Sequence, residues 1–184
     1  MSEVAAQPLP ADVIAFWRAA GPEKWFEKNA AFDDEIRRRF LNVHEAATSG
    51  KLTAWEASAE GALALLILLD QFPRNMFRGQ ARAFATDPLA RAIASRAILS
   101  GFDGAFPDMR SFFYLPFEHS EDLADQERGL TLYKAAGDED GLKWAKIHAD
   151  IIHRFGRFPH RNAVLGRVST PEEQKFLDDG GFAG

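Results

Sequence analysis

The sequence predicts an all-helical protein of about seven to nine helices in antiparallel pairs, without a sheet. Apolar residues recur at helical spacing through most of the chain, and residues that start or stop helices bound these stretches. No segment alternates apolar and polar residues as a strand does, and no Asn-Gly or Asp-Gly turn joins two such segments.

Two helices are expected in the first fifty residues. Asp12 precedes a short amphipathic segment, which Gly21-Pro22 ends. Asp33 and Asp34 open the second helix, whose apolar positions keep helical spacing until a stop at Gly50.

The next helix is expected to be the buried centre of the fold. Thr53 and Glu56 have the spacing of a capping box, in which each side chain satisfies an amide at a helix start. Residues 62–69 are apolar on every face, which indicates a helix surrounded by protein. Asp87-Pro88 starts a further helix with a capping carboxylate and a proline at the first position, and Gly101 ends it.

The C-terminal part is expected to hold three helices after an irregular stretch over residues 101–117. Residues 120–122 start the first of these helices, and Gly137 ends it. The second begins near Gly141, and residues 170–173 repeat the capping pattern at the start of the last.

Composition narrows the classes of function. The 184 residues are expected to form one domain over residues 1–184, since no linker rich in Pro, Gly or Ser divides them. The chain has no cysteine, which excludes thiolate catalysis, cysteine-bound zinc, iron–sulfur clusters and disulfides. A net charge of −5 and no long apolar run predict a cytoplasmic protein without a nucleic-acid or membrane partner. The oligomeric state is left open.

Two segments share a near-repeat, and we call them corner 1 (residues 69–79) and corner 2 (residues 155–167). In each, an apolar helix runs into Phe-Pro, followed by arginine, asparagine, an apolar residue and glycine. Because proline disfavours the helical conformation of the residue before it, each Phe-Pro is expected to end its helix. Arginine outnumbers lysine 15 to 7, and neither corner contains lysine. Since guanidinium suits bidentate pairing with carboxylate or phosphate, the corners are candidate anion sites.

Residues 114–122, between the corners, are expected to form an acid-rich turn that also carries an imidazole. Glu118 and His119 are candidate catalytic residues, because imidazole titrates near neutrality and a neighbouring carboxylate raises its pKa. Asp70 is expected to pair with a corner arginine or to cap a helix.

No metal site is expected. His148 and His153 would lie about 140° apart around one helix, so they cannot share a metal, and the chain has no His-Glu-x-x-His motif. His148 is predicted to be a core residue with one hydrogen bond. His44 is predicted to be solvated or to bind a nearby acid in its own helix.

Three long motifs resemble a bacterial family. LDQFPRNMFRG, FYLPFEHSED and RFGRFPHRNAVLGR with STPEE are similar to the family called domain of unknown function number 924. The similarity runs from Phe16 and Trp17 to the end of the chain. It implies a fold related to tetratricopeptide repeats, with helix pairs in a right-handed arrangement. The family has no established activity, so the resemblance assigns no catalytic residue and no cofactor.

The leading hypothesis is a cleft where both corners meet the Glu118–His119 turn and bind a small anionic ligand or an acidic peptide. His119 and His160 would donate or shuttle protons, and Glu118 and Asp122 would orient the arginines. The predicted ligand-binding residues are the polar groups of the corners and one acid of the turn: Arg74, Asn75, Arg78, Asp122, Arg157, His160, Arg161 and Asn162.

Two other hypotheses stay open. In the first, the same cleft belongs to a hydrolase-like enzyme, and Glu118 or His119 transfers the proton. In the second, the arginine–acid cluster is only structural, and the helical surface is a scaffold that binds partner proteins.

Overall fold

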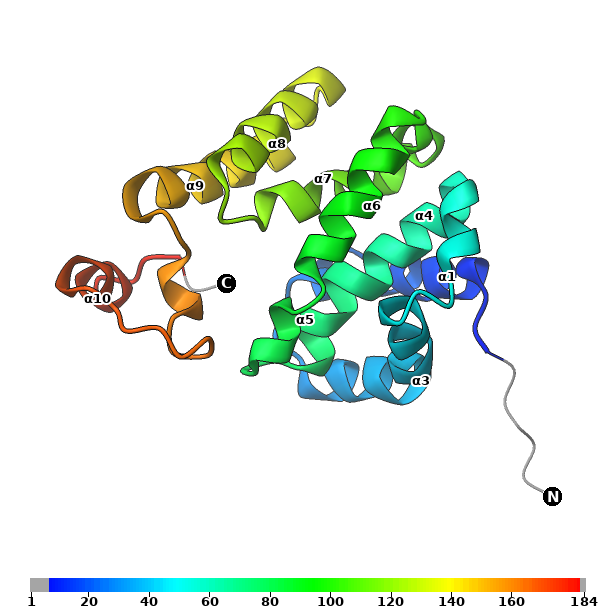
Figure 1. Ribbon diagram of the computed structural model, residues 1–184, viewed down its shortest axis with the longest axis horizontal. Helices are drawn as coiled ribbons and strands as arrows, with labels where there is room; N and C mark the ends of the chain where they lie inside the picture. The colour runs from blue at the N-terminus through cyan, green and yellow to red at the C-terminus, as the bar shows by residue number, and fades with distance from the viewer. Residues whose placement is uncertain (1–6, 183–184) are drawn as a thin grey trace. The chain divides into compact units, whose positions relative to one another are not determined.

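The computed structural model describes residues 7–182, which form α-helices and short 3₁₀- and π-helical turns with no strand among them (Figure 1). The predicted all-helical class is therefore confirmed, while the right-handed, repeat-like arrangement stays a prediction. The described chain forms two compact units: unit 1 contains residues 7–78 and 82–116, and unit 2 contains residues 79–81 and 117–182. Whether the chain is a single domain over residues 1–184 also stays a prediction.

Unit 1 is built around α4, which packs against α1 and α6, while α5 packs against α3 (Figure 1). The elements up to the unit boundary are α1 (Pro10–Ala20), α2 (Pro22–Trp25), α3 (Ala30–Thr48), η1 (Thr53–Ala57), α4 (Ala59–Leu66), η2 (Ile67–Gln71), α5 (Phe72–Met76), η3 (Ala81–Phe84), α6 (Asp87–Leu99), η4 (Phe102–Ala105), η5 (Pro107–Met109) and α7 (Ser111–Glu118). Residues 62–69 are buried throughout, as their apolar sequence predicts. None of the described helices is long and apolar enough to cross a bilayer.

Aromatic rings join α1, α3 and α5 in the core of unit 1. The ring of Trp17 meets that of Phe72 edge-on with centroids 5.5 Å apart, and Phe72 lies 4.8 Å from Phe40. All three side chains are buried. Aromatic contacts of this kind add specificity to the burial of a large apolar area, so they fix how these helices pack.

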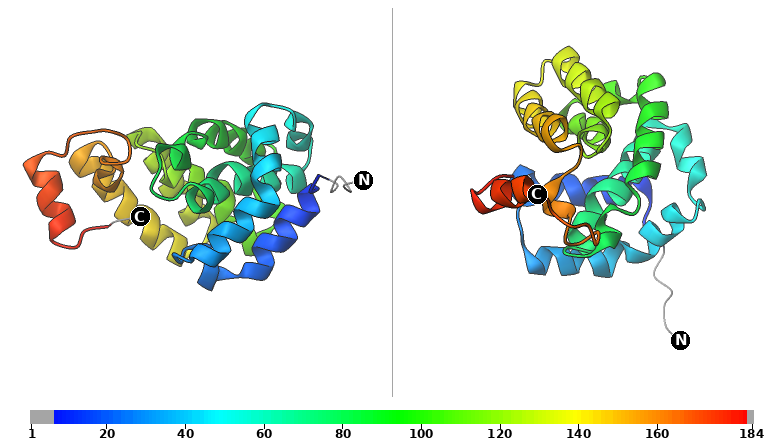
Figure 2. Two further views of the ribbon diagram at one scale, coloured as in Figure 1. Left: turned by 90° about the horizontal axis from the view of Figure 1, so that it is seen from below. Right: turned by 60° about the vertical axis from the view of Figure 1, so that its left-hand side comes forward.

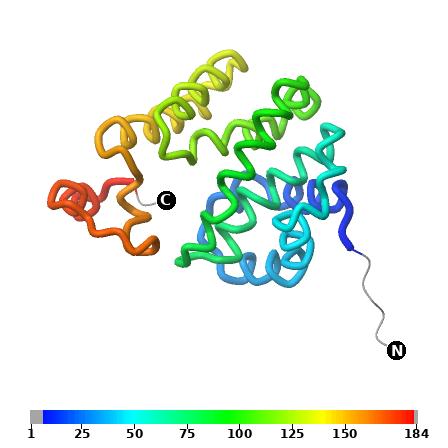
Figure 3. The backbone as a smooth tube through the Cα atoms, viewed as in Figure 1, coloured from blue at the N-terminus to red at the C-terminus, as the bar shows by residue number. Residues whose placement is uncertain are grey.

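Corner 1 does not end the helix before it. The backbone continues from α4 through the π-helical turn η2 into α5 (Figure 3). Pro73 lies in the first turn of α5. Proline has no amide hydrogen, so it cannot donate to the carbonyl of Leu69 four residues earlier. The hydroxyl of Thr86 donates to this carbonyl instead, at 2.5 Å. The prediction that Phe-Pro ends this helix is wrong, because a wider turn and a side-chain donor accommodate the proline.

His44 supports the same turn. Its side chain is 2% exposed, and its Nδ1 donates to the carbonyl of Leu68 at 2.9 Å. Burial lowers the pKa of His44, because the charged ring loses its hydration there. The prediction of a solvated or acid-bound histidine is wrong at this position.

The helix that was expected to start at Thr53 starts later. Thr53 lies in the 3₁₀ turn η1, where its hydroxyl donates to the carbonyl of Gly50 at 2.6 Å. Ser58 caps α4 instead, and its hydroxyl oxygen accepts the amide of Gly61 at 3.1 Å. The capping-box prediction for Thr53 and Glu56 is therefore wrong, because a second hydroxyl stands closer to the apolar segment.

Unit 2 is a helical hairpin followed by a short C-terminal helix (Figure 2). Its elements are α8 (Leu123–Ala136), α9 (Glu139–Phe155), η6 (Pro159–Arg161) and α10 (Pro171–Asp178). Gly137 ends α8 in the left-handed conformation, and Thr170 forms a capping box with Glu173 at the start of α10, both as predicted. Gly156, not Phe-Pro, ends α9 in corner 2.

We predict that Thr86→Val lowers the free energy of unfolding by about 1–3 kcal/mol, because it leaves the buried carbonyl of Leu69 without its hydroxyl donor. Valine keeps the shape of threonine, so packing changes little. Urea unfolding measures the effect. The matched control is Thr53→Val, which removes a hydroxyl from an exposed turn of the same unit. Equal losses in the two variants would contradict the prediction.

Candidate functional site

Carboxylates of unit 1 bind the first arginine of corner 1. Arg74 donates to both oxygens of Asp87, at 3.0 and 3.1 Å, and lies 3.3 Å from Asp70. Asp70 and Asp87 are 1% and 5% exposed. Burial by itself would lower the pKa of Arg74, but the charges of these two acids raise it above its ordinary value. The predicted pairing of Asp70 with a corner arginine is confirmed.

Asn75 and Arg78 bind one acid at the start of α3. Arg78 donates to the two oxygens of Asp33 at 2.8 and 3.0 Å, and the amide nitrogen of Asn75 donates to one of them at 2.8 Å. These bonds tie corner 1 to α3. Both side chains therefore have a structural role in unit 1, whatever else they bind.

In corner 2, Arg157 and Asn162 converge on the buried carboxylate of Glu173. Arg157 donates to its two oxygens at 2.6 and 2.7 Å, and the amide nitrogen of Asn162 lies 3.2 Å away. The backbone amide of Thr170 donates to the same carboxylate at 2.7 Å. The hydrogen bond from Arg157 is the main cause that lowers the pKa of Glu173 to about 2. The capping acid of α10 is thus also the partner of corner 2.

The acids between the corners also have structural contacts. Glu121 accepts from Arg167 at 2.7 and 2.9 Å and from the amide of Phe158 at 2.8 Å. Burial would raise the pKa of Glu121, but these hydrogen bonds outweigh it and lower the pKa. Asp122 caps α8 by accepting the amide of Ala124 at 2.7 Å. This cap, rather than an arginine, orients the carboxylate of Asp122.

Glu118 ends a helix where the sequence suggested an irregular turn. α7 runs from Ser111 to Glu118 with Pro116 inside it, so the prediction of irregular backbone over its residues is wrong. The buried amide of Gln126 holds the end of α7 by donating to the carbonyls of Glu118 and Ser120, at 2.7 and 2.6 Å. Glu118 is therefore placed by backbone bonds as well as by packing.

Unit 2 gathers imidazoles around this buried acid. We call the group the histidine cluster, and it consists of Glu118, His119, His148, Phe158, His160, Arg161 and Phe182. Four of the predicted site residues belong to it, whereas Arg157, Asn162 and Asp122 contribute to neighbouring structural bonds. The cluster is built on α7, α9, η6 and the segment after α10.

The central contact joins Glu118 and His148. Nδ1 of His148 lies 3.0 Å from Oε1 of Glu118, and the two side chains are 8% and 4% exposed, histidine first. The same Nδ1 lies 2.9 Å from the carbonyl of Trp144. Since both neighbours are acceptors, Nδ1 carries a hydrogen. A carboxylate on Nδ1 and a lone pair on Nε2 are the requirements of a general base.

Rings and cations surround this pair. His119 lies 6.3 Å from His148 between ring centroids, and His160 lies 5.6 Å from Phe158. The guanidinium of Arg161 lies 4.4 Å from the centre of the Phe158 ring. His119 and His160 are partly exposed, whereas Arg161 is buried. No group of three or more potential ligands in residues 7–182 is arranged to hold a metal ion.

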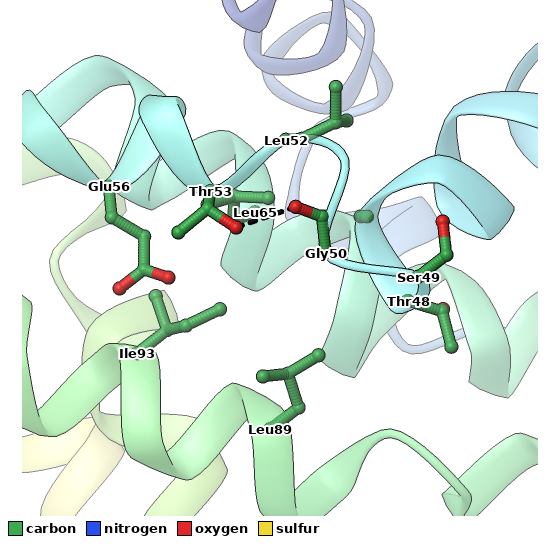
Figure 4. Close-up of a pocket in the computed structure, with 10 residues that line it drawn as sticks. Thr48, Ser49, Gly50, Leu52, Thr53, Glu56, Leu65, Leu89 and Ile93 are labelled. Atoms are coloured by element: carbon green, nitrogen blue, oxygen red, sulfur yellow. Dashed lines mark hydrogen bonds between the residues drawn. The ribbon is translucent and has the colours of Figure 1, made fainter.

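Unit 1 contains a separate pocket of about 290 Å³, and five of its ten lining residues are aliphatic (Figure 4). Figure 4 shows Leu65, Leu89 and Ile93 around it, with the carboxylate of Glu56 beside Ile93. Glu56 is ion-paired with Arg96 at 2.6 Å. This cavity has no imidazole in its lining, so it offers less for proton transfer than the histidine cluster does.

Sequence reasoning missed the partner of Glu118. His148 is buried, as predicted, but it binds an acid from another helix in addition to its helical carbonyl. The sequence does contain a signal for this partner. His148 is an ionisable residue on the apolar stripe of α9, and a polar side chain buried at such a position requires a hydrogen-bonding partner.

We predict that the Arg157–Glu173 pair makes stability depend on pH. Because its folded-state pKa of about 2 lies below the ordinary 4.5, Glu173 stabilises the fold above about pH 4.5 and loses this contribution as pH falls towards 2. Glu173→Gln should lower the Tm by several degrees near neutrality and flatten the acid limb of the profile. Thermal melts across this range test it. The neighbouring variant Glu172→Gln, which affects an exposed pair with Arg154, should match the unmodified chain.

Comparisons with known proteins agree with the motifs. A family model described as bacterial protein of unknown function (DUF924) matches residues 13–181. A solved structure of a protein of unknown function from Agrobacterium tumefaciens is 52% identical, with a TM-score of 0.90 over 93% of this chain and 97% of that chain. A search of curated proteins gives no match. The match over almost the whole chain shows that this protein belongs to the bacterial family of unknown function DUF924.

Proposed function

We propose that this protein is a hydrolase-like enzyme whose acid–base pair is Glu118 and His148. The observation that supports the proposal is the 3.0 Å contact between Oε1 of Glu118 and Nδ1 of His148, made by two buried side chains. The contact therefore joins the side chains of an acid and a histidine that are both shielded from solvent. Low solvent exposure strengthens such a pair, because water does not compete for its hydrogen bond.

The proposed chemistry uses the two nitrogens of one ring. The carboxylate of Glu118 and the carbonyl of Trp144 both lie beside the Nδ1 hydrogen, and the carboxylate would stabilise the imidazolium that forms when Nε2 takes a proton. Nε2 would withdraw that proton from a water molecule and return it to the leaving group. His119, predicted as a catalytic residue, is a candidate for a second proton carrier because its ring neighbours His148.

The substrate proposed for this site is a small anion. His119, His160 and Arg161 provide three groups of the histidine cluster that can carry positive charge. Arg74, Arg78 and Arg157 are not needed for this role, since carboxylates of their own units bind them. Their pairs support the structural hypothesis for these three arginines.

A second candidate function is anion binding without turnover. It is supported by the same three groups that can carry positive charge, and it does not require proton transfer. Titration with inorganic phosphate, followed by NMR of the imidazole resonances, separates the two. Shifts at His119 and His160 without hydrolysis of any ester would favour binding alone. The cytoplasmic location and the exclusion of nucleic-acid and membrane partners stay sequence-based predictions.

We predict that Glu118→Gln lowers kcat/KM by about a hundredfold or more, because glutamine keeps the shape of the side chain but removes its charge. A panel of phosphate monoesters, carboxylic esters and amides supplies the substrates. His153→Gln is the control, since His153 lies on the same helix but is half exposed and binds the exposed Glu127. Equal rates for the unmodified chain and Glu118→Gln on every hydrolysed substrate would refute the proposal.

A further inference from the structure

We propose that residues 179–182, which follow α10, form a cover that controls access to the histidine cluster, with Phe182 as the residue that closes it. This inference rests on the proposed function, because it concerns access to the same acid–base pair. Phe182 follows the last helix of the chain, so its position depends on a turn rather than on a regular element.

Phe182 packs on two of the three imidazoles. Its ring lies 4.5 Å from that of His148 and 5.4 Å from that of His160, both edge-on. It also contacts the small apolar core formed by Ile151, Ile152 and Phe158. The ring of Phe182 therefore covers the imidazole of His148, which is the proposed base, and it is held there by ring and apolar contacts.

Two glycines direct Phe182 back to the cluster. Gly180 adopts a φ of 80° and donates its amide to the carbonyl of Leu177 at 3.1 Å. Gly181 donates to the carbonyl of Phe176 at 2.9 Å. A Cβ at Gly181 would lie 2.5 Å from that carbonyl oxygen and 2.6 Å from the Phe176 ring. The two glycines thus favour a tight turn in which the backbone packs against α10 and Phe182 returns to α9.

A cover that can open meets two requirements of an acid–base pair, which are the exclusion of water and access for a substrate. Excluding water strengthens the Glu118–His148 contact, but a substrate must still reach Nε2. Phe182 is partly exposed, whereas Ile152 and Phe158 beneath it are 1% and 0% exposed. Displacing the ring of Phe182 therefore requires less free energy than exposing Ile152 and Phe158. Phe182 is thus the residue of the cover that a substrate displaces.

The test uses diethyl pyrocarbonate, which acylates neutral imidazole nitrogens, on the full chain. Peptide mass spectrometry gives a separate rate for each histidine. In Phe182→Ala, the rates at His148 and His160 should rise about tenfold, which corresponds to closure weakened by about 1.4 kcal/mol. Gly181→Ala should have the same effect, since its Cβ forces the turn open. Gly104→Ala, where a Cβ meets nothing within 4 Å, should leave every rate unchanged.

Two other histidines show whether the effect is local. His153 is half exposed and His44 is buried in unit 1, and both rates should stay constant. An unchanged rate at His148 in the two cover variants would overturn the inference. A rise at His44, or loss of a cooperative melt, would also overturn it, because Phe182 would then be a core residue.

The result also separates this inference from the proposed function. If Glu118→Gln keeps full turnover but Phe182→Ala still exposes His148, the proposed acid–base role fails and the cover stands. If Glu118→Gln abolishes turnover but Phe182→Ala leaves the rate at His148 unchanged, the enzyme proposal stands and the cover fails.

Discussion

Buried carboxylates determine where the cationic side chains of this protein lie. A carboxylate removed from water costs several kcal/mol unless donors replace its hydration. Asp70 and Asp87 both pair with Arg74, and both carboxylate oxygens of Glu173 accept hydrogen bonds from Arg157. Arg74 and Arg157 of the two corners therefore have a structural role as partners of buried carboxylates. Glu118 differs from these acids because a histidine is among its partners, and a histidine exchanges its proton near neutral pH.

The two corners show that a shared sequence signature does not fix a shared backbone. In corner 1 a π-helical turn precedes proline, and the chain stays helical through Phe72–Met76. In corner 2 the left-handed Gly156 ends α9 before the Phe-Pro pair is reached. Proline restricts the residue before it in both cases, but that restriction leaves room for a widened helix when a tertiary donor hydrogen-bonds to the released carbonyl.

Local backbone requirements made much of the fold predictable from sequence. The start of α10 at Thr170-Pro171 and the end of α8 at Gly137 follow from caps that act within a few residues. α7 was missed because Pro116 counts against a helix in any local rule. The candidate site was found in part: Glu118 was identified, but its contact with His148 joins two helices that only tertiary packing brings together.

The π-helical turn of corner 1 amounts to an α-helix with one surplus residue. Deleting one residue between Ile67 and Gln71 would remove the surplus and let regular α-helical winding continue into α5. Regular winding would press the ring of Pro73 against the carbonyl four residues before it, a clash that the wider turn relieves. The length of this segment is therefore as constrained as its composition. Members of the family should differ here by substitutions more often than by insertions or deletions.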